Sequence, residues 1–143
     1  MSLEKAIAAD IHCFTVAGGA QLSCYRSQPE HLDPDARPLV LLHSINAAPS
    51  AIEMKPLFDH FAGSRVVYAP DLPGFGQSQR GDLPYSPDFY AQVISDFLGQ
   101  IDGPAPDVVA LSLTGEFTAR ALRDNSPEIH SLTLISPTGL GRN

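Results

Sequence analysis

The sequence predicts an α/β fold: a mostly parallel sheet with helices on both faces and an antiparallel hairpin at its N-terminal end. The composition, 43% hydrophobic and 17% charged over 143 residues, is typical of a single globular domain spanning residues 1–143. From residue 38 onward, short apolar segments alternate with segments of helical length, as they do when helices cover a parallel sheet. Ahead of them, two strand-like segments flank Gly18-Gly19, which favours a hairpin.

The hairpin comes first, with strands expected over residues 11–17 and 20–26. If Gly18 and Gly19 form a two-residue turn, Cys13 and Cys24 lie directly opposite each other, with Cα atoms about 5.5 Å apart. This spacing permits a disulfide bond but does not require one, and we expect two reduced thiols in a cytoplasmic protein.

Four further strands are expected over residues 38–43, 65–68, 107–111 and 131–136. Their apolar residues do not alternate with polar ones, which predicts that each strand is buried on both faces. Residues Leu132 to Ile135 end the predicted sheet as an apolar edge that another strand would cover.

Three helices are expected between these strands. The first covers residues 51–62, with Pro56 marking its first true turn, and the third begins just after Ser112 and ends near residue 125. The second opens at Ser86-Pro87, a hydroxyl cap followed by a proline at the first helical position. Its inward face carries residues four positions apart: Phe89, Val93, Phe97 and Ile101.

Charge and composition exclude several classes of function. The net charge of -7 argues against nucleic-acid and anionic-membrane partners. The apolar segments are far shorter than the ~20 residues of a membrane helix, and the N-terminus lacks the long apolar segment typical of a signal peptide, so we expect a cytoplasmic location. Two cysteines cannot form a four-ligand zinc site, and no metal or cofactor is implied. The expected partner is a small-molecule substrate.

The segment around Ser112 has the clearest chemical meaning. An apolar strand runs into a helix through Ser112, with Ala110 two residues before it and Thr114 two residues after it. A nucleophile at such a bend adopts a strained backbone conformation, and its neighbours must be small so that strand and helix pass closely. The bend exposes a hydroxyl at a helix N-terminus, where free N–H groups stabilise negative charge. An ordinary N-cap serine is the alternative interpretation.

Two more motifs follow strands at the same predicted sheet edge. His43-Ser44-Ile45-Asn46 enters a loop of small residues whose N–H groups are placed to stabilise an oxyanion; a plain turn with a hydrogen-bonded histidine is the alternative. Residues 71–78, Asp-Leu-Pro-Gly-Phe-Gly-Gln-Ser, contain two glycines but no third glycine and no Lys-Ser/Thr pair. A nucleotide site is therefore disfavoured, and we expect a tight turn braced by Asp71 along one wall of a cleft.

These three motifs, in this order, resemble those of the alpha/beta-hydrolase superfamily with a serine nucleophile, and the resemblance spans about residues 11 to 143. It implies that Ser112 is the nucleophile and that the N–H groups of Leu113 and Ile45 form the oxyanion hole. It also implies that His43 is a structural residue beside that hole.

The sequence departs from the family pattern at three glycines, which are replaced by Ser44, Ala110 and Thr114. All three replacements are small. In the superfamily that the chain resembles, epoxide hydrolases and haloalkane dehalogenases have an aspartate at the nucleophile position. The serine at position 112 is unlike them in this respect. The predicted site wall consists of His43, Ser44, Ile45, Asn46, Phe75 and Leu113. Such a wall predicts uncharged, moderately hydrophobic acyl substrates.

The family places its catalytic acid and histidine after the nucleophile, but residues 131–143 contain no Asp, Glu or His. His130 opens the last strand, about 20 Å from the carboxyl edge where the chemistry occurs. We therefore expect a partial fold that ends after the sixth strand. A C-terminal half with a cap, or a second polypeptide, would pair with Leu132 to Ile135 and supply the missing groups. A non-catalytic binding or interaction module is the alternative.

Overall fold

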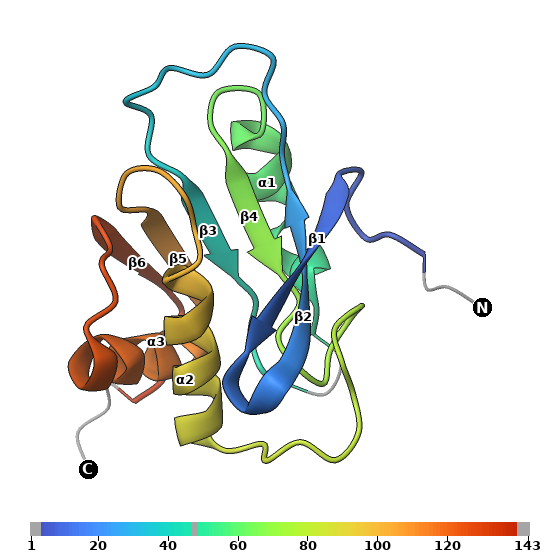
Figure 1. Ribbon diagram of the computed structural model, residues 1–143, viewed down its shortest axis with the longest axis vertical. Helices are drawn as coiled ribbons and strands as arrows, with labels where there is room; N and C mark the ends of the chain where they lie inside the picture. Colours follow the sequence, from blue (N-terminus) through green and yellow to red (C-terminus); the bar gives the residue numbers. More distant parts are fainter. Residues whose placement is uncertain (1–3, 47–48, 140–143) are drawn as a thin grey trace.

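The computed structural model describes residues 4–46 and 49–139 and contains one six-stranded sheet in the order β1-β2-β4-β3-β5-β6 (Figure 1). The strands are β1 (Asp10–Val16), β2 (Ala20–Arg26), β3 (Leu39–Leu42), β4 (Val67–Pro70), β5 (Asp107–Leu111) and β6 (Ser131–Ile135). Strands β3 to β6 are parallel, whereas β1 and β2 form an antiparallel pair that joins the sheet through β4. The predicted fold class is confirmed.

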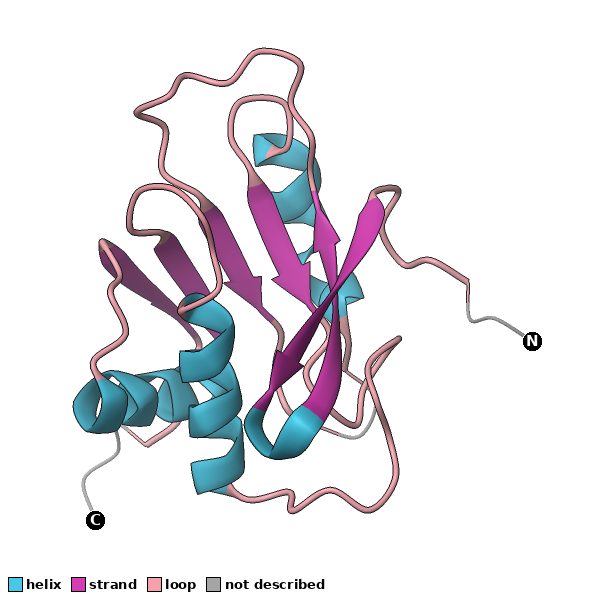
Figure 2. Ribbon diagram, in the orientation of Figure 1, coloured by secondary structure: helices cyan, strands magenta, loops and turns pink. Residues whose placement is uncertain are grey.

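Helices cover both faces of the sheet (Figure 2). The helices are α1 (Lys55–Phe61), α2 (Pro87–Leu98) and α3 (Leu113–Asn125), with 3-10 turns η1 (Ala17–Gly19) and η2 (Ala51–Met54). Helices α2 and α3 lie side by side on one face, and α1 lies on the other. The first predicted helix is thus divided into η2 and α1, and Pro56 stands in the first turn of α1 as expected.

The central strand β3 separates two apolar cores. Val40 and Leu42 face the core beneath α2 and α3, whereas Leu39 and Leu41 face the core beneath α1. All four residues are buried, so β3 is covered on both faces as its apolar sequence predicts. This placement fixes the carboxyl end of β3, from which His43 and the following loop extend.

The hairpin has a different register from the predicted one. The turn contains three residues, Ala17–Gly19, and both of its glycines have positive φ, which glycine adopts without steric cost. Cys13 therefore pairs with Ser23, and Cys24 pairs with His12. The two thiols are free, with Cys13 exposed and Cys24 buried, so the expected cross-strand cysteine pair is wrong. A shift of one residue moves each side chain to the other face of a strand.

Strand β6 is also less covered than its sequence predicts. It forms one edge of the sheet, and its residues are exposed apart from Leu132, which is half-buried. Leu134 and Ile135 are 37% and 36% exposed. The prediction of burial on both faces is wrong for this strand within the described residues, because burial depends on neighbouring elements as well as on the strand's own residues.

Arg65 ties together the amino ends of three parallel strands. Its guanidinium donates to the carbonyl oxygens of Arg37 and Pro38, and its Nη2 lies 2.8 Å from the Asp107 carboxylate. Ser131 donates to the other oxygen of Asp107 at 2.6 Å. Partial burial alone would raise the pKa of Asp107, but the hydrogen bonds from Ser131 and Arg65 outweigh it and hold that pKa below its usual value.

Candidate active site

Ser112 joins β5 to α3 through a strained backbone conformation. Its φ is 56° and its ψ is -129°, a combination that costs a residue with a side chain about 1–3 kcal/mol. Its N–H donates to the Ile135 carbonyl of β6 at 2.8 Å, and its carbonyl accepts from the Gly115 N–H at 3.0 Å. Two backbone hydrogen bonds thus hold the bend in place from both sides.

The Ser112 hydroxyl does not cap the helix that follows it. Its side chain makes no capping hydrogen bond, and no other partner for it lies within the described part of the chain. Ser86 at the start of α2 provides the contrast: its φ is -151°, and its hydroxyl accepts the Phe89 N–H at 3.0 Å. Ser86 is therefore an ordinary N-cap serine. Ser112 differs from it both in the sign of φ and in the absence of a capping hydrogen bond.

Small residues around Ser112 allow the close approach that the bend requires. A Cβ atom at Gly115 would lie 2.9 Å from Leu134 Cδ2, so α3 starts in direct contact with β6. Thr114, which stands where the family pattern has glycine, is fully buried, and its hydroxyl donates to the His43 carbonyl at 2.5 Å. That hydrogen bond joins the first turn of α3 to the end of β3, so the two predicted oxyanion segments are adjacent.

Both nitrogens of the buried His43 ring are used by the backbone. The Leu72 N–H donates to Nε2 at 2.8 Å, which assigns the ring proton to Nδ1, and Nδ1–H donates to the Ser44 carbonyl at 2.7 Å. Burial lowers the pKa of His43 and is the largest influence on it, so the ring is neutral at pH 7. His43 is therefore not free to take a proton from Ser112.

The His43 hydrogen bond also sets the direction of the next amide. The Ser44 carbonyl and the Ile45 N–H belong to one planar trans peptide, in which they point in opposite directions. Because the carbonyl points to the His43 ring, the Ile45 N–H points away from it. On the other side of the elbow, Leu113 is the first residue of α3, where an N–H group has no partner within the helix.

The turn after β4 is braced by Asp71, as the sequence predicts. Its buried carboxylate accepts the Ala51 N–H at 2.8 Å and the Gln77 N–H at 2.9 Å. Gly76 has a φ of 51°, and a Cβ atom there would overlap the Asp71 carboxyl group. A side chain at position 76 is thus excluded twice, by backbone conformation and by space.

The predicted wall residues occupy two depths. His43 and Ser44 are 0% and 4% exposed, so they lie beneath the loop that they support rather than at its surface. Ile45, Phe75 and Leu113 are half-buried, and Asn46 is exposed. Phe75 meets His43 edge to face, with ring centroids 5.6 Å apart, and so joins the turn after β4 to the loop after β3.

The other four histidines lie on separate elements. His130 precedes β6, and its N–H donates to Pro106 at the amino end of β5, opposite the end that carries Ser112. His12, His31 and His60 lie on β1, on the loop after β2 and on α1. No histidine among residues 4–46 and 49–139 is therefore placed as a base for Ser112.

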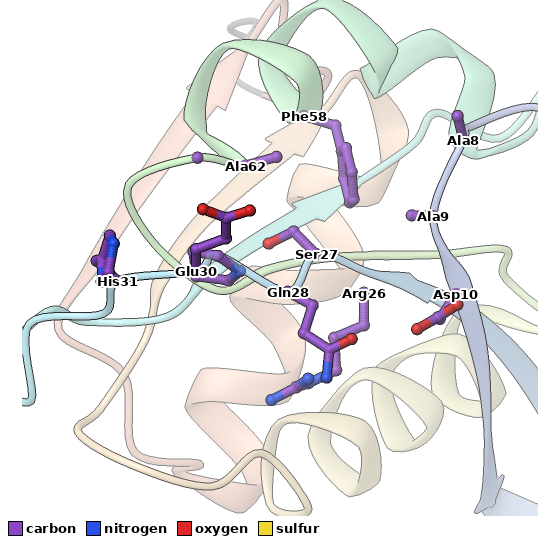
Figure 3. Close-up of a pocket in the computed structure, with 12 residues that line it drawn as sticks. Ala8, Ala9, Asp10, Arg26, Ser27, Gln28, Glu30, His31, Phe58 and Ala62 are labelled. Atoms are coloured by element: carbon purple, nitrogen blue, oxygen red, sulfur yellow. The ribbon is translucent and has the colours of Figure 1, made fainter.

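Other features of the described chain do not lead to the site. A hollow of about 610 Å³, lined in part by Asp10, Arg26, Glu30 and His31, lies beside the start of β1, the end of β2 and the end of α1 (Figure 3). That is the amino end of the parallel strands, away from Ser112. In the described ranges, no three His, Cys, Asp or Glu side chains lie together in a way that would hold a metal ion. None of the described helices has the length and hydrophobicity of a bilayer-spanning segment.

Solved structures of several hydrolases are similar to this one. The N-formylmaleamic acid deformylase Nfo from Pseudomonas putida has a TM-score of 0.76 at 22% identity, over 94% of this chain and 50% of its own. The haloalkane dehalogenase DatA from Agrobacterium tumefaciens has a TM-score of 0.73 at 20% identity, over 94% of this chain and 44% of its own. CarC, a serine hydrolase involved in carbazole degradation, has a TM-score of 0.71 at 21% identity, over 92% of this chain and 50% of its own.

The chain thus spans half or less of the length of each of these proteins, and the similarity is one of fold. No curated protein matches the chain in sequence. A model of the alpha/beta hydrolase family matches residues 39–142, which include the loop after β3, the Asp71 turn and the Ser112 bend. On the strength of that match over most of its length, the chain belongs to the alpha/beta hydrolase family.

Proposed function

We propose that the chain carries the nucleophile and the oxyanion hole of a serine hydrolase that cleaves an ester, a thioester, an amide or an activated C–C bond. The observation that carries this proposal is the conformation of Ser112, whose φ is 56° and whose hydroxyl does not cap α3. An ordinary cap gains nothing from such strain, whereas a nucleophile needs it to stand clear of the sheet. The dehalogenases of this superfamily use an aspartate at the nucleophile position, so the serine at position 112 also argues against a dehalogenase mechanism.

In the proposed reaction, Ser112 Oγ attacks the substrate carbonyl, and its proton passes to a histidine. The N–H groups of Leu113 and Ile45 donate to the oxyanion that forms. Collapse of this intermediate breaks the scissile bond, and the histidine returns the proton to the leaving group. Water then repeats the attack on the acyl-enzyme with the same base and releases the acid.

The histidine and the carboxylate that orients it come, in this proposal, from sequence outside residues 1–143 or from a second polypeptide. Two observations support this part. The described histidines are engaged or distant from Ser112, and the similar solved structures are at least twice as long as the matched region. The exposed strand β6 is the place where the completing strand would pair.

Covalent labelling tests the proposal. A fluorophosphonate probe should modify Ser112 in the complete protein, and peptide mass mapping should locate the adduct there. Ser112→Ala should abolish labelling and ester hydrolysis. Ser126→Ala is a matched control, because Ser126 also has a positive φ of 47° but lies at the far end of α3. Hydrolysis by the Ser112→Ala variant at the wild-type rate would refute the proposal.

The substrate class follows from the half-buried wall. Ile45, Phe75 and Leu113 are apolar, which favours uncharged and moderately hydrophobic acyl groups. A panel of p-nitrophenyl esters that differ in acyl chain measures this preference. A higher kcat/KM for anionic acyl chains would contradict it.

A non-catalytic binding module is the second candidate, and the lack of a placed base among the described histidines favours it. The labelling experiment separates the two. A complete protein that binds small ligands but is not labelled at Ser112 supports the binding module.

A further inference from the structure

Glu53 contacts the candidate oxyanion loop although nothing in its sequence context suggests a role. It lies in η2, and its carboxylate accepts the Ser44 N–H at 3.1 Å. The Ser44 hydroxyl donates to the same carboxylate, 2.7 Å from Oε1 and 2.9 Å from Oε2. Hydrogen bonds to an ionised acceptor are stronger than neutral ones, so this is a firm attachment.

The remaining polar atoms of Ser44 are fixed as well. Its hydroxyl oxygen accepts from Asn46 Nδ2 at 2.9 Å, and its carbonyl accepts from His43 Nδ1–H. Every polar group of Ser44 thus has a hydrogen-bond partner: Glu53 for the N–H, Glu53 and Asn46 for the hydroxyl, and His43 for the carbonyl. Ser44 is 4% exposed whereas Glu53 is an exposed residue, so the contact is shielded from water on the Ser44 side.

The segment that carries Glu53 is itself anchored. The Ala51 N–H donates to Asp71, and both Ala51 and Met54 are buried. Glu53 is therefore held on a frame that belongs to the α1 face of the sheet. Through Ser44, that frame fixes one end of the planar peptide whose other end is the Ile45 N–H.

We propose that Glu53 is a positioning residue for the oxyanion hole: its carboxylate holds Ser44 and thereby aims the Ile45 N–H at the oxygen of the substrate carbonyl. This inference rests on the proposed function. It also accounts for the serine at position 44, because a glycine there would offer the carboxylate no hydroxyl. Glu53 does not touch the substrate, so its effect appears in the transition state and not in substrate binding.

Steady-state kinetics of the complete protein test the inference. Glu53→Gln should lower kcat for an ester about tenfold, since loss of a whole oxyanion donor costs about 10²–10³-fold and here the donor is only misaligned. KM should change by less than about twofold. A boronic acid that forms a tetrahedral adduct with Ser112 should bind about tenfold more weakly, in parallel with kcat.

A double-mutant cycle shows whether Glu53 acts through Ser44. In a Ser44→Ala background, Glu53→Gln should lower kcat by no more than about twofold further, because the two residues belong to one contact. Asp59→Asn is the matched control: it removes one negative charge from α1, where Asp59 pairs with Lys55 at the surface, and kcat should not change.

Two results would overturn the inference. An unchanged kcat in Glu53→Gln would show that the contact is only structural, and a raised kcat would show that the carboxylate opposes the oxyanion more than it aligns the donor. Failure of the proposed function looks different, because the wild-type protein would then lack both labelling and turnover. In that case the amide signal of Ile45 in an NMR spectrum still reports whether Glu53→Gln disorders the loop, and an unaltered signal counts against the inference.

Discussion

Ser112 is the residue at which sequence and geometry agree most closely. A serine between small residues, after an apolar strand, predicts a bend, and the backbone there has a φ of 56°. The contact between Ser44 and Glu53 could not be predicted in this way, because the two residues lie nine positions apart across a loop and no periodic pattern joins them. The same holds for the partners of His43, which come from the turn after another strand.

Relief of strain at Ser112 should stabilise the protein at the expense of the nucleophile. Glycine adopts positive φ freely, whereas alanine does not. We expect Ser112→Gly to be more stable than Ser112→Ala by about 1 kcal/mol, measured as the free energy of unfolding in urea. The control is Ser86→Gly, which should lose stability because Ser86 is an ordinary cap with a φ of -151°. A Ser112→Gly variant less stable than Ser112→Ala would mean that the bend is unstrained.

His43 should make stability depend on pH. Burial lowers the pKa of His43 in the folded state, whereas the unfolded chain takes up a proton on that ring near pH 6.5. Between these two values the unfolded state binds more protons, so the free energy of unfolding falls as the pH drops below about 6.5. Urea titrations at a series of pH values measure the slope. It should shrink in His43→Gln and persist in His60→Gln, since His60 lies at the exposed end of α1.

At the scale of elements, six strands and three helices follow from the apolar segments and their caps. The register of the hairpin does not, because a pair of glycines is compatible with both a two-residue and a three-residue turn. The exposure of β6 could not be read from its residues either: Leu-Thr-Leu-Ile is apolar whether or not another element covers it. Both the hairpin register and the exposure of β6 depend on contacts with other parts of the structure, which the local sequence does not specify.

The turn after β4 should fail if Gly76 gains a side chain. In Gly76→Ala the new Cβ would collide with the Asp71 carboxyl group, and φ would remain at 51°. We expect a loss of about 2 kcal/mol or more in the free energy of unfolding, because strain and a broken buried hydrogen-bond network combine. Gly18→Ala separates the two causes: its φ is 67°, but nothing lies within 4 Å of the added atom. Equal losses in both variants would show that the Asp71 contact contributes nothing.

Among the described residues, helices lie on both faces of the sheet, and its two edge strands are β1 and β6. Helices α2 and α3 lie together over one core, while β6 stands at the end of the sheet with Leu134 and Ile135 partly exposed. Family membership could be predicted from three motifs, because each of them lies at the carboxyl end of a parallel strand, β3, β4 or β5. The base and acid could not be located, because no described residue occupies their places.

An open apolar edge strand should make the 143-residue chain associate with itself. We expect its sedimentation coefficient to rise with concentration, since within the described ranges no strand pairs with the outer side of β6, which carries apolar side chains. Thr133→Lys, which places a charge on an exposed position of β6, should reduce this association. A chain that stays monomeric at high concentration would show that the edge is already protected.

The one-residue shift of the hairpin has a practical consequence. It leaves Cys13 on the solvent side of β1, while Cys24 is fully buried and burial raises the pKa of its thiol well above the usual value. In the native protein a maleimide therefore finds a single reactive sulfur, on the strand at the opposite end of the sheet from β6. A fluorophore attached there would serve as an energy-transfer donor in a test for a labelled partner at β6, and no engineered cysteine is needed.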